Sequence, residues 1–216
     1  LAAEVAVRAV DMSHVVIVMM DDYLATTEAG FTYCPAAAHY SCRRFAAESI
    51  VAPINRNLDG PNRIPADHVW LPDPAAPELF DERLRNAGGV NVFLTASGAS
   101  DGHVAFNPPG SPLSSHSRIV AIAATTRRDN LGTFPAFKSL SDVPGHGVTV
   151  GLGTIRDASA RVVMVIHGAH KRDAVARLAA AREFSADWPA SFVYECRDAQ
   201  LLLERQCFPA KRRNAL

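Results

Sequence analysis

The sequence predicts an α/β fold, a modified Rossmann-type sheet that is mainly parallel and carries helices on both faces. Three observations predict it: short continuous apolar runs recur along the chain, longer helix-compatible segments separate them, and polar clusters follow the runs directly. Continuous apolar strands are typical of parallel sheets covered on both sides, whose crossovers are right-handed. A chain of 216 residues with 48% apolar side chains has room for one domain over residues 1–216.

The first expected strand, 14–20, is the run His-Val-Val-Ile-Val-Met-Met, which ends at a double acid. The second, 90–95, ends in a turn of small residues, Ala96 to Ser100. The remaining strands are apolar runs of the same kind, bounded by turn residues or charges: 118–123, 147–151, 161–167 and 191–195. In open α/β sheets ligands bind beyond the carboxyl ends of the strands, so we expect a functional site after the first two runs.

Helices are expected in the segments between these strands. They are predicted at 36–54, 76–85, 169–183 and 198–206. The Pro-rich stretch 64–77 is interpreted as a surface connection rather than a domain linker.

The charge balance and the cysteine content indicate which kinds of ligand and partner to expect. The 22 basic and 22 acidic side chains leave a net charge of 0 and a pI near 7.2, which exerts no overall attraction for nucleic acid or anionic lipid. We therefore expect a small-molecule ligand, no nucleic-acid partner and no membrane partner, and read the basic segment 211–213 as a solvated tail. The four cysteines form no CxxC pair and are predicted to be reduced, mostly structural thiols.

No apolar stretch approaches the roughly 20 residues that cross a bilayer, and residues 1–10 carry Glu4 and Arg8 rather than the pattern of a secretory signal. The sequence therefore predicts a cytoplasmic protein.

Asp21 and Asp22 directly follow the first expected strand. Adjacent side chains at a strand end point in opposite directions, so one acid is expected to enter the crevice as a candidate base while the other braces the backbone. The alternative is an ordinary helix or turn cap, for which Asp is a preferred residue.

Asp101 and His103 are separated by one glycine in a turn after the second strand. At this spacing a carboxylate can orient an imidazole and raise its basicity, and Gly102 lets the backbone bend. Asp-Gly is also a common turn dipeptide, so a plain turn is the competing interpretation.

Five strings occur in the order of one known family: Met19-Met-Asp-Asp-Tyr23, Asp101-Gly-His-Val-Ala-Phe-Asn107, Ser114-Ser-His-Ser-Arg118, Val148-Thr-Val-Gly-Leu-Gly-Thr154 and Gly168-Ala-His-Lys171. Together they resemble the glucosamine-6-phosphate deaminase family, over about residues 10 to 207. The related 6-phosphogluconolactonases share its fold. The resemblance implies a sheet like that of the deaminases, ribose-5-phosphate isomerases and CoA-transferases, with its pocket at the strand carboxyl ends.

The resemblance also implies roles for residues. Asp21 matches the family acid that moves a proton between C1 and C2 of the opened aminosugar, and Asp101 and His103 match the pair that opens the pyranose ring. Lys171 matches a lysine that contacts the substrate phosphate. The expected catalytic residues are thus Asp21, Asp101 and His103, and the expected substrate-binding residues are Asp22, Gly102 and Lys171. No metal and no organic cofactor is expected, because the carbon acid is activated by its own carbonyl or iminium.

Three departures from the family pattern stand out. Pro108 occupies the position of a glutamate that completes a relay with the histidine. Gly132 or Thr133 stands where the family has a phosphate-binding arginine, for which Arg127, Arg128 or Lys138 could substitute. The N-terminal strand and Gly-rich phosphate loop that precede the first motif are not found ahead of residue 10, so the domain is expected to lack them.

The first hypothesis is an enzyme that isomerises a hexose or aminosugar 6-phosphate between aldose and ketose, with or without loss of ammonia. A second is a lactonase in which His103 activates water. A third is a non-catalytic paralogue that binds sugar phosphates. Because Asp21 and His103 are both present, we expect an enzyme. Self-association into a homo-oligomer is an expectation of the resemblance alone.

Overall fold

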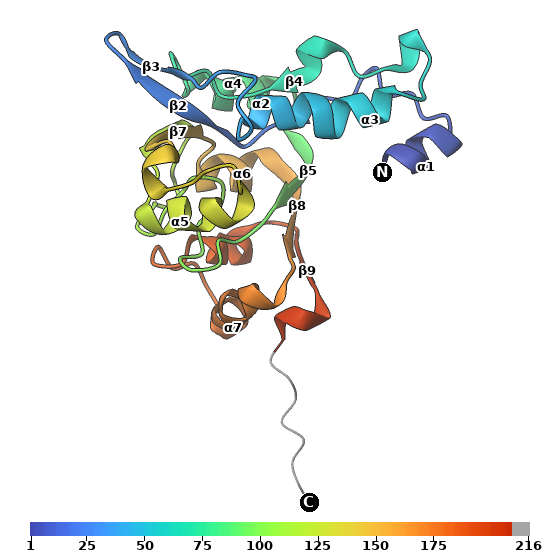
Figure 1. Ribbon diagram of the computed structural model, residues 1–216. Helices are drawn as coiled ribbons and strands as arrows, with labels where there is room; N and C mark the ends of the chain where they lie inside the picture. Colours follow the sequence, from blue (N-terminus) through green and yellow to red (C-terminus); the bar gives the residue numbers. More distant parts are fainter. Residues whose placement is uncertain (209–216) are drawn as a thin grey trace, which may run out of the picture.

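Three β-sheets organise the chain in the computed structural model, which describes residues 1–208 (Figure 1). The basic segment 211–213, expected to be a solvated tail, lies outside the described residues. None of the helices described is long and apolar enough to span a membrane.

A three-stranded parallel sheet, in the order β5-β8-β9, forms the centre of the largest core. Its strands are β5 (Val90–Thr95), β8 (Ser159–Ile166) and β9 (Ala199–Leu203). One face carries buried side chains such as Phe93, Val162 and Met164. Against it pack α4 (Leu79–Asn86), α6 (Leu152–Ala158) and α7 (Arg172–Ala180). Alternation of side chains along a strand places these apolar residues on the covered face.

The opposite face of this sheet exposes apolar side chains. Leu94 is 62% exposed, Leu202 53% and Val92 51%. The expectation of helices on both faces therefore differs from what residues 1–208 show, in which the packed helices lie on one face of the parallel sheet.

A four-stranded antiparallel sheet, in the order β3-β2-β7-β6, packs beside the parallel one. It contains β2 (Asp21–Thr27), β3 (Gly30–Tyr33), β6 (Arg118–Ala121) and β7 (His146–Thr149). The α/β class is confirmed, with two parallel sheets, whereas this second large sheet is antiparallel throughout. The turn between β2 and β3 explains why these two strands are antiparallel. Gly30, with a φ of +119°, helps close a two-residue turn after Thr27. So short a turn can join only antiparallel strands.

The first expected strand is much shorter than predicted. Only β1 (Ile17–Val18) pairs there, parallel to β4 (Val69–Trp70). The double acid then opens β2 rather than following a strand end, since Asp21 pairs with Thr149 of β7.

Two further expectations were wrong. Residues 191–195 lie in a 3-10 helix, Pro189–Glu195, and most of 198–206 is strand β9 rather than a helix. Phe192 and Val193 are buried, and a short buried apolar run does not by its periodicity separate helix from strand.

The remaining helices agree with the sequence in place but not in length. The expected helix 36–54 begins at α2 (Cys42–Phe45), passes through a π-helical turn, Ala46–Val51, and ends with α3 (Ala52–Asn55). Pro53 cannot donate a backbone hydrogen bond, and the widened turn lies just ahead of it. The expected helix 169–183 is a 3-10 turn, Ala169–Lys171, followed by α7. Further 3-10 turns are Gly60–Asn62, Ala66–His68, Leu140–Asp142 and Arg205–Cys207.

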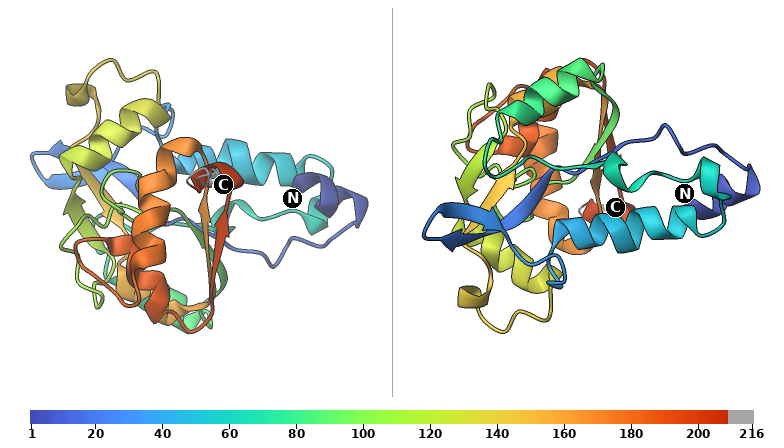
Figure 2. Two further views of the ribbon diagram at one scale, coloured as in Figure 1. Left: turned by 90° about the horizontal axis from the view of Figure 1, so that it is seen from below. Right: turned by 90° about the horizontal axis from the view of Figure 1, so that it is seen from above.

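Helix α1 (Ala2–Val7) packs against α3 in a small separate core that includes Val5, Ile54 and Leu58. Figure 2 shows these two helices projecting from the body of the molecule. Helix α5 (Ala124–Thr133) lies at the antiparallel sheet, where its Asn130 donates a hydrogen bond to the hydroxyl of Tyr23 on β2 at 2.7 Å. This contact ties α5 to the strand that carries the double acid.

Candidate active site

A cavity of about 480 Å³ opens between the two main sheets, at the carboxyl ends of β5 and β8. Asp21, His103 and Lys171 all line it, although 82 and 68 residues separate them along the chain. The structure thus brings together one acid, one imidazole and one ammonium group, in the region where ligands of α/β sheets bind.

Asp21 is the first residue of β2 and faces this cavity. Burial raises the pKa of its carboxyl group to about 7, and the charge of Asp22 adds to the shift. The hydrogen bond from Cys42 and the charge of His103 act in the opposite direction. A carboxyl group that titrates near neutral pH can both accept and release a proton, as a proton shuttle must.

Asp22 occupies the opposite face of β2 and is completely buried. Its carboxylate accepts hydrogen bonds from the backbone N–H of Cys42 at 2.9 Å and from Nε of Arg43 at 3.0 Å. It therefore braces β2 against the start of α2. Asp22 was expected to bind substrate, whereas strand alternation turns it away from the cavity that Asp21 faces, and it does not line that cavity.

The Asp101 carboxylate lies behind His103, with Oδ1 at 2.6 Å from Nδ1 of the imidazole. The same oxygen accepts a bond from the backbone N–H of His103 at 3.1 Å, and the hydroxyls of Thr125 and Thr126 donate to Oδ2. Burial by itself would raise the pKa of Asp101. The hydrogen bonds and the charge of His103, together with the hydrogen bond from the Thr125 hydroxyl, have the larger effect and hold this pKa well below its usual range. An ionised Asp101 accepts from Nδ1, so the other ring nitrogen, Nε2, remains for proton transfer.

Two glycines shape this turn. Gly102 has a φ of +67°, and a side chain there would meet the ring of Trp188 at 2.4 Å. Gly98 packs directly over the pair, since a Cβ atom at this position would lie 2.2 Å from Nδ1 of His103. Gly102 was predicted as a substrate-binding residue, and its observed contacts are with Trp188 and, through its carbonyl, the backbone N–H of Ala190.

Lys171 lies where the sequence placed it, after β8 and Gly168 and immediately before α7. Its ammonium group donates a hydrogen bond to the carbonyl of Ser97 at 2.7 Å, and burial lowers its pKa. The ammonium group and the N-terminus of α7 are a combination suited to an anion.

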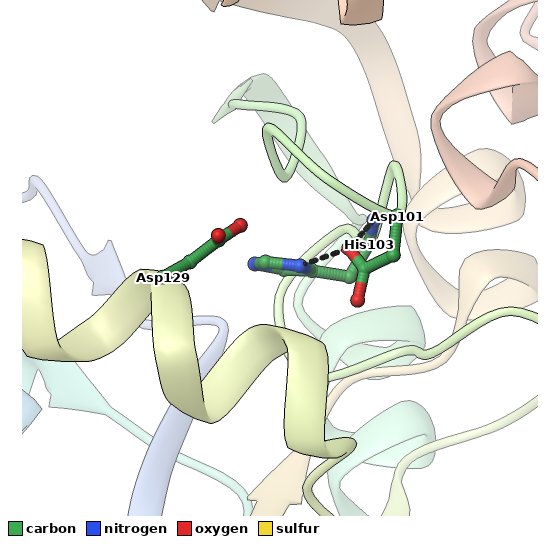
Figure 3. Close-up of side chains that lie close together, drawn as sticks. All are labelled: Asp101, His103 and Asp129. Carbon is green, nitrogen blue, oxygen red and sulfur yellow. Dashed lines mark hydrogen bonds and ion pairs between the residues drawn. The ribbon is translucent and has the colours of Figure 1, made fainter. Parts of the chain in front are cut away.

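Asp129, on α5, is the third member of a cluster with Asp101 and His103 (Figure 3). One side-chain oxygen or nitrogen from each residue lies within 4.8 Å of the others. Within residues 1–208 this is the one group of His, Cys, Asp and Glu side chains compact enough to hold a metal ion. The direct bond between Asp101 and Nδ1 already occupies the nearest ligand atoms, so the geometry resembles a proton-transfer pair more than a metal centre.

Sequence reasoning missed several residues of the site, namely Cys42, Gly98, Thr125, Thr126 and Asp129. Three of them follow one pattern, because Thr125 and Thr126 lie four and three residues ahead of Asp129, spacings that make each a neighbour of Asp129 on the helix surface. Cys42, one of four cysteines predicted to be reduced and mostly structural, borders the cavity, and all four cysteines are free thiols.

One further expectation concerns the phosphate. Arg127, one of the proposed substitutes for the family arginine, binds backbone carbonyls of Leu140 and Val143 instead. A smaller cavity of about 320 Å³ between α4 and α6, with Asp81 and Asp157 in its wall, contains none of the predicted site residues.

Comparison with known proteins gives a consistent set of relatives. No family model matches the chain. The glucosamine-6-phosphate deaminase of Shouchella clausii is 31% identical over 187 residues, covering 84% of this chain and 67% of the relative. That of Streptomyces coelicolor is 35% identical over 179 residues, covering 82% and 62%. That of Arthrobacter sp. (strain FB24) is 44% identical over 102 residues, covering 47% and 37%. The alignments therefore span about one third to two thirds of these relatives' own lengths.

Solved structures show the same fold. A monomeric glucosamine-6-phosphate deaminase matches with a TM-score of 0.76 at 22% identity, covering 95% of this chain and 79% of that one. The 6-phosphogluconolactonase of Trypanosoma cruzi matches with a TM-score of 0.60 at 15% identity, covering 95% and 76%. At sequence identities of 22% and 15%, these two matches show a shared fold.

Proposed function

This chain belongs to the glucosamine-6-phosphate deaminase family, and from that premise we propose that it catalyses aldose-ketose isomerisation of an aminosugar 6-phosphate with release of ammonia. The observation that carries the proposal is the convergence of Asp21, His103 and Lys171 on one cavity. Each supplies a different requirement of the reaction: a base at carbon, an acid-base group at the ring oxygen, and a cation for the phosphate.

Ring opening comes first in this proposal. Nε2 of His103 gives a proton to the ring oxygen as the bond between that oxygen and C1 breaks, and it takes up the proton of the C1 hydroxyl, so that C1 becomes an aldehyde. Asp101 holds the imidazole through Nδ1 at 2.6 Å, which fixes the ring orientation and stabilises positive charge as it develops.

Proton transfer between carbons follows. The Asp21 carboxylate removes the proton from C2 of the opened aminosugar and returns it to C1, while the oxygen at C1 gains the proton that the ammonium group loses, which leaves a C1 hydroxyl and an iminium group at C2. Water adds to C2 and ammonia leaves, which gives the ketose phosphate. The near-neutral pKa of Asp21 suits a group that must take and give the same proton.

Lys171 is proposed to bind the phosphate, together with the N-terminus of α7. A lysine is a common phosphate ligand. Its location beside Ser97, after β5, supports a phosphate at the end of the cavity near the parallel sheet.

The partners and the location that we propose are the ones expected from the sequence. We propose a small-molecule sugar phosphate as the partner, no nucleic acid or membrane partner, and self-association as the family resemblance implies. A cytoplasmic location is supported by the four free thiols.

The test is incubation with glucosamine 6-phosphate in deuterated water, followed by proton NMR and an ammonia assay. We expect ammonia and deuterium incorporation at C1 of the product, both lost in Asp21→Asn. Glu28→Gln, in the exposed turn between β2 and β3, is the matched control and should retain activity.

Other results would redirect the proposal. Deuterium exchange without ammonia would leave an isomerase and refute the deamination step. Hydrolysis of a 6-phosphogluconolactone that depends on His103 but not on Asp21 would favour the lactonase. Binding of the sugar phosphate without any turnover would favour the non-catalytic paralogue.

A further inference from the structure

We propose that Asp129 is a positioning residue for His103, a second carboxylate that stabilises the protonated imidazole from the side opposite Asp101. The inference rests on the proposed function for its catalytic meaning, because His103 must carry a proton to open a sugar ring. The arrangement of Asp101, His103 and Asp129 is a feature of the free protein, so it can be tested without a substrate.

Asp129 is held in place by the loop that follows β5. Its carboxylate accepts a hydrogen bond from the backbone N–H of Ala99 at 3.2 Å and from the hydroxyl of Ser100 at 3.2 Å. This loop leads directly into Asp101, so the bonds fasten α5 to the turn that carries His103. An anchored carboxylate keeps its charge at a fixed distance from the imidazole.

The two carboxylates flank the imidazole. Figure 3 shows Asp101 bonded to one ring nitrogen of His103 and Asp129 beyond the other end of the ring. One oxygen of Asp129 lies within 4.8 Å of the ligand atoms of both partners. Separations of this size are within the range at which an opposite charge favours the protonated form of a histidine.

The charged groups around His103 come from four parts of the fold. Asp101 lies on its own loop, Asp129 on α5, Asp21 on β2, and Lys171 after β8. Two of these acids already have roles in the proposed reaction: Asp101 holds Nδ1 of His103, and Asp21 moves the proton at the substrate carbon. Asp129 has no role in those steps. Its charge also acts on Lys171, so it balances the cation that lines the same cavity.

Helix α5 is built to bring these groups together. Thr125 and Thr126 donate to Asp101, and Asp129 follows one turn later on the same face. Pro108 offers no carboxylate to His103. Asp129 approaches the imidazole from α5, a different part of the chain.

The test is an NMR pH titration of the Cε1 proton of His103 in the free protein, assigned with His103→Asn. In Asp129→Asn, which keeps hydrogen-bonding groups for the loop, the midpoint should move to lower pH by about 0.6 unit or more, the shift expected for unit charges 4.8 Å apart in a medium as polar as water. Ser100→Ala removes one anchor and keeps the charge, so it should leave the midpoint near that of the parent protein.

The same variants have an activity readout. With glucosamine 6-phosphate, Asp129→Asn should move the basic limb of the kcat profile to lower pH, while Ser100→Ala should not. A midpoint unchanged in Asp129→Asn, or an equal shift in both variants, overturns the role of Asp129. If Asp129→Asn does not fold, Asp129→Ser gives the same comparison. A parent protein without activity whose histidine still shifts would refute the proposed function and leave this inference standing.

Discussion

The thiol of Cys42 lies 3.4 Å from Oδ1 of Asp21 and donates a hydrogen bond to it. Burial raises the pKa of this thiol well above its ordinary value, and the charges of Asp21 and Asp22 add to the effect, so the sulfur keeps its proton and acts as a donor. The backbone N–H of the same residue binds Asp22. Cys42 thereby contacts both acids at the start of β2.

Cys42→Ala should shift the pH dependence of proton transfer. The hydrogen bond lowers the pKa of Asp21 from the value that burial alone would give, so its loss should raise that pKa above about 7. The acid limb of deuterium exchange with glucosamine 6-phosphate should move to higher pH. Cys42→Ser, which retains a donor, should stay closer to the parent, and Cys196→Ala serves as the distant control. An unmoved limb in Cys42→Ala would show that the thiol does not influence the base.

Asp21→Asn should stabilise the protein at alkaline pH. Because the folded-state pKa of about 7 exceeds the ordinary value of 3.8, the native state binds more protons than the unfolded state between about pH 4 and 7, and stability falls as pH rises through that window. Removing the acid should increase the free energy of unfolding at pH 8 by up to about 4 kcal/mol. Urea unfolding at pH 5 and pH 8 measures the difference, which should be smaller at pH 5. Equal effects at both pH values would contradict the raised pKa.

Asp101→Asn should lower kcat by about 10² to 10⁴-fold, the range for loss of an oriented acid-base group. The amide cannot stabilise an imidazolium ion and can present its N–H₂ to Nδ1, which favours the wrong tautomer. Steady-state ammonia release is the measurement. Asp187→Asn, at an exposed carboxyl group, should be neutral; a similar loss there would point to a general effect on folding.

Gly98→Ala should impair the site more than the fold. Its added methyl would lie 2.2 Å from Nδ1 of His103, so the imidazole must move away from Asp101. Gly132→Ala is the contrast, because space around Gly132 on α5 is open, and alanine there should stabilise the helix by about 0.5 to 1 kcal/mol. Activity and thermal unfolding of both variants test the difference, and full activity in Gly98→Ala would refute the described packing.

Lys171→Ala should raise KM for the sugar phosphate at least tenfold, with a smaller effect on kcat, because a phosphate ion pair acts in the ground state as well as the transition state. Arg182→Ala removes an exposed cation just beyond α7 and should leave KM unchanged. A kcat loss without a KM change would place Lys171 at the reacting carbons rather than at the phosphate.

Much of this site was accessible from the sequence because its chemistry lies in short local strings. Asp101, Gly102 and His103 are close in the chain, and their turn follows a strand that the apolar pattern locates correctly at 90–95. The role proposed for Asp21 likewise came from its motif. Strand alternation also indicated that one of the two acids would brace the backbone, and in the structure Asp22 does so through Cys42 and Arg43.

The sequence by itself determined the α/β class, the family and the turn that bears His103, since these depend on local patterning and on strings of adjacent residues. Only the tertiary structure decided that strands 14–20 and 191–195 are largely absent, that β2 pairs antiparallel with β7, and that Asp129 faces His103. The physical reason is that pairing partners and the approach of α5 depend on contacts between residues distant in the chain, and periodicity along the chain carries no information about them.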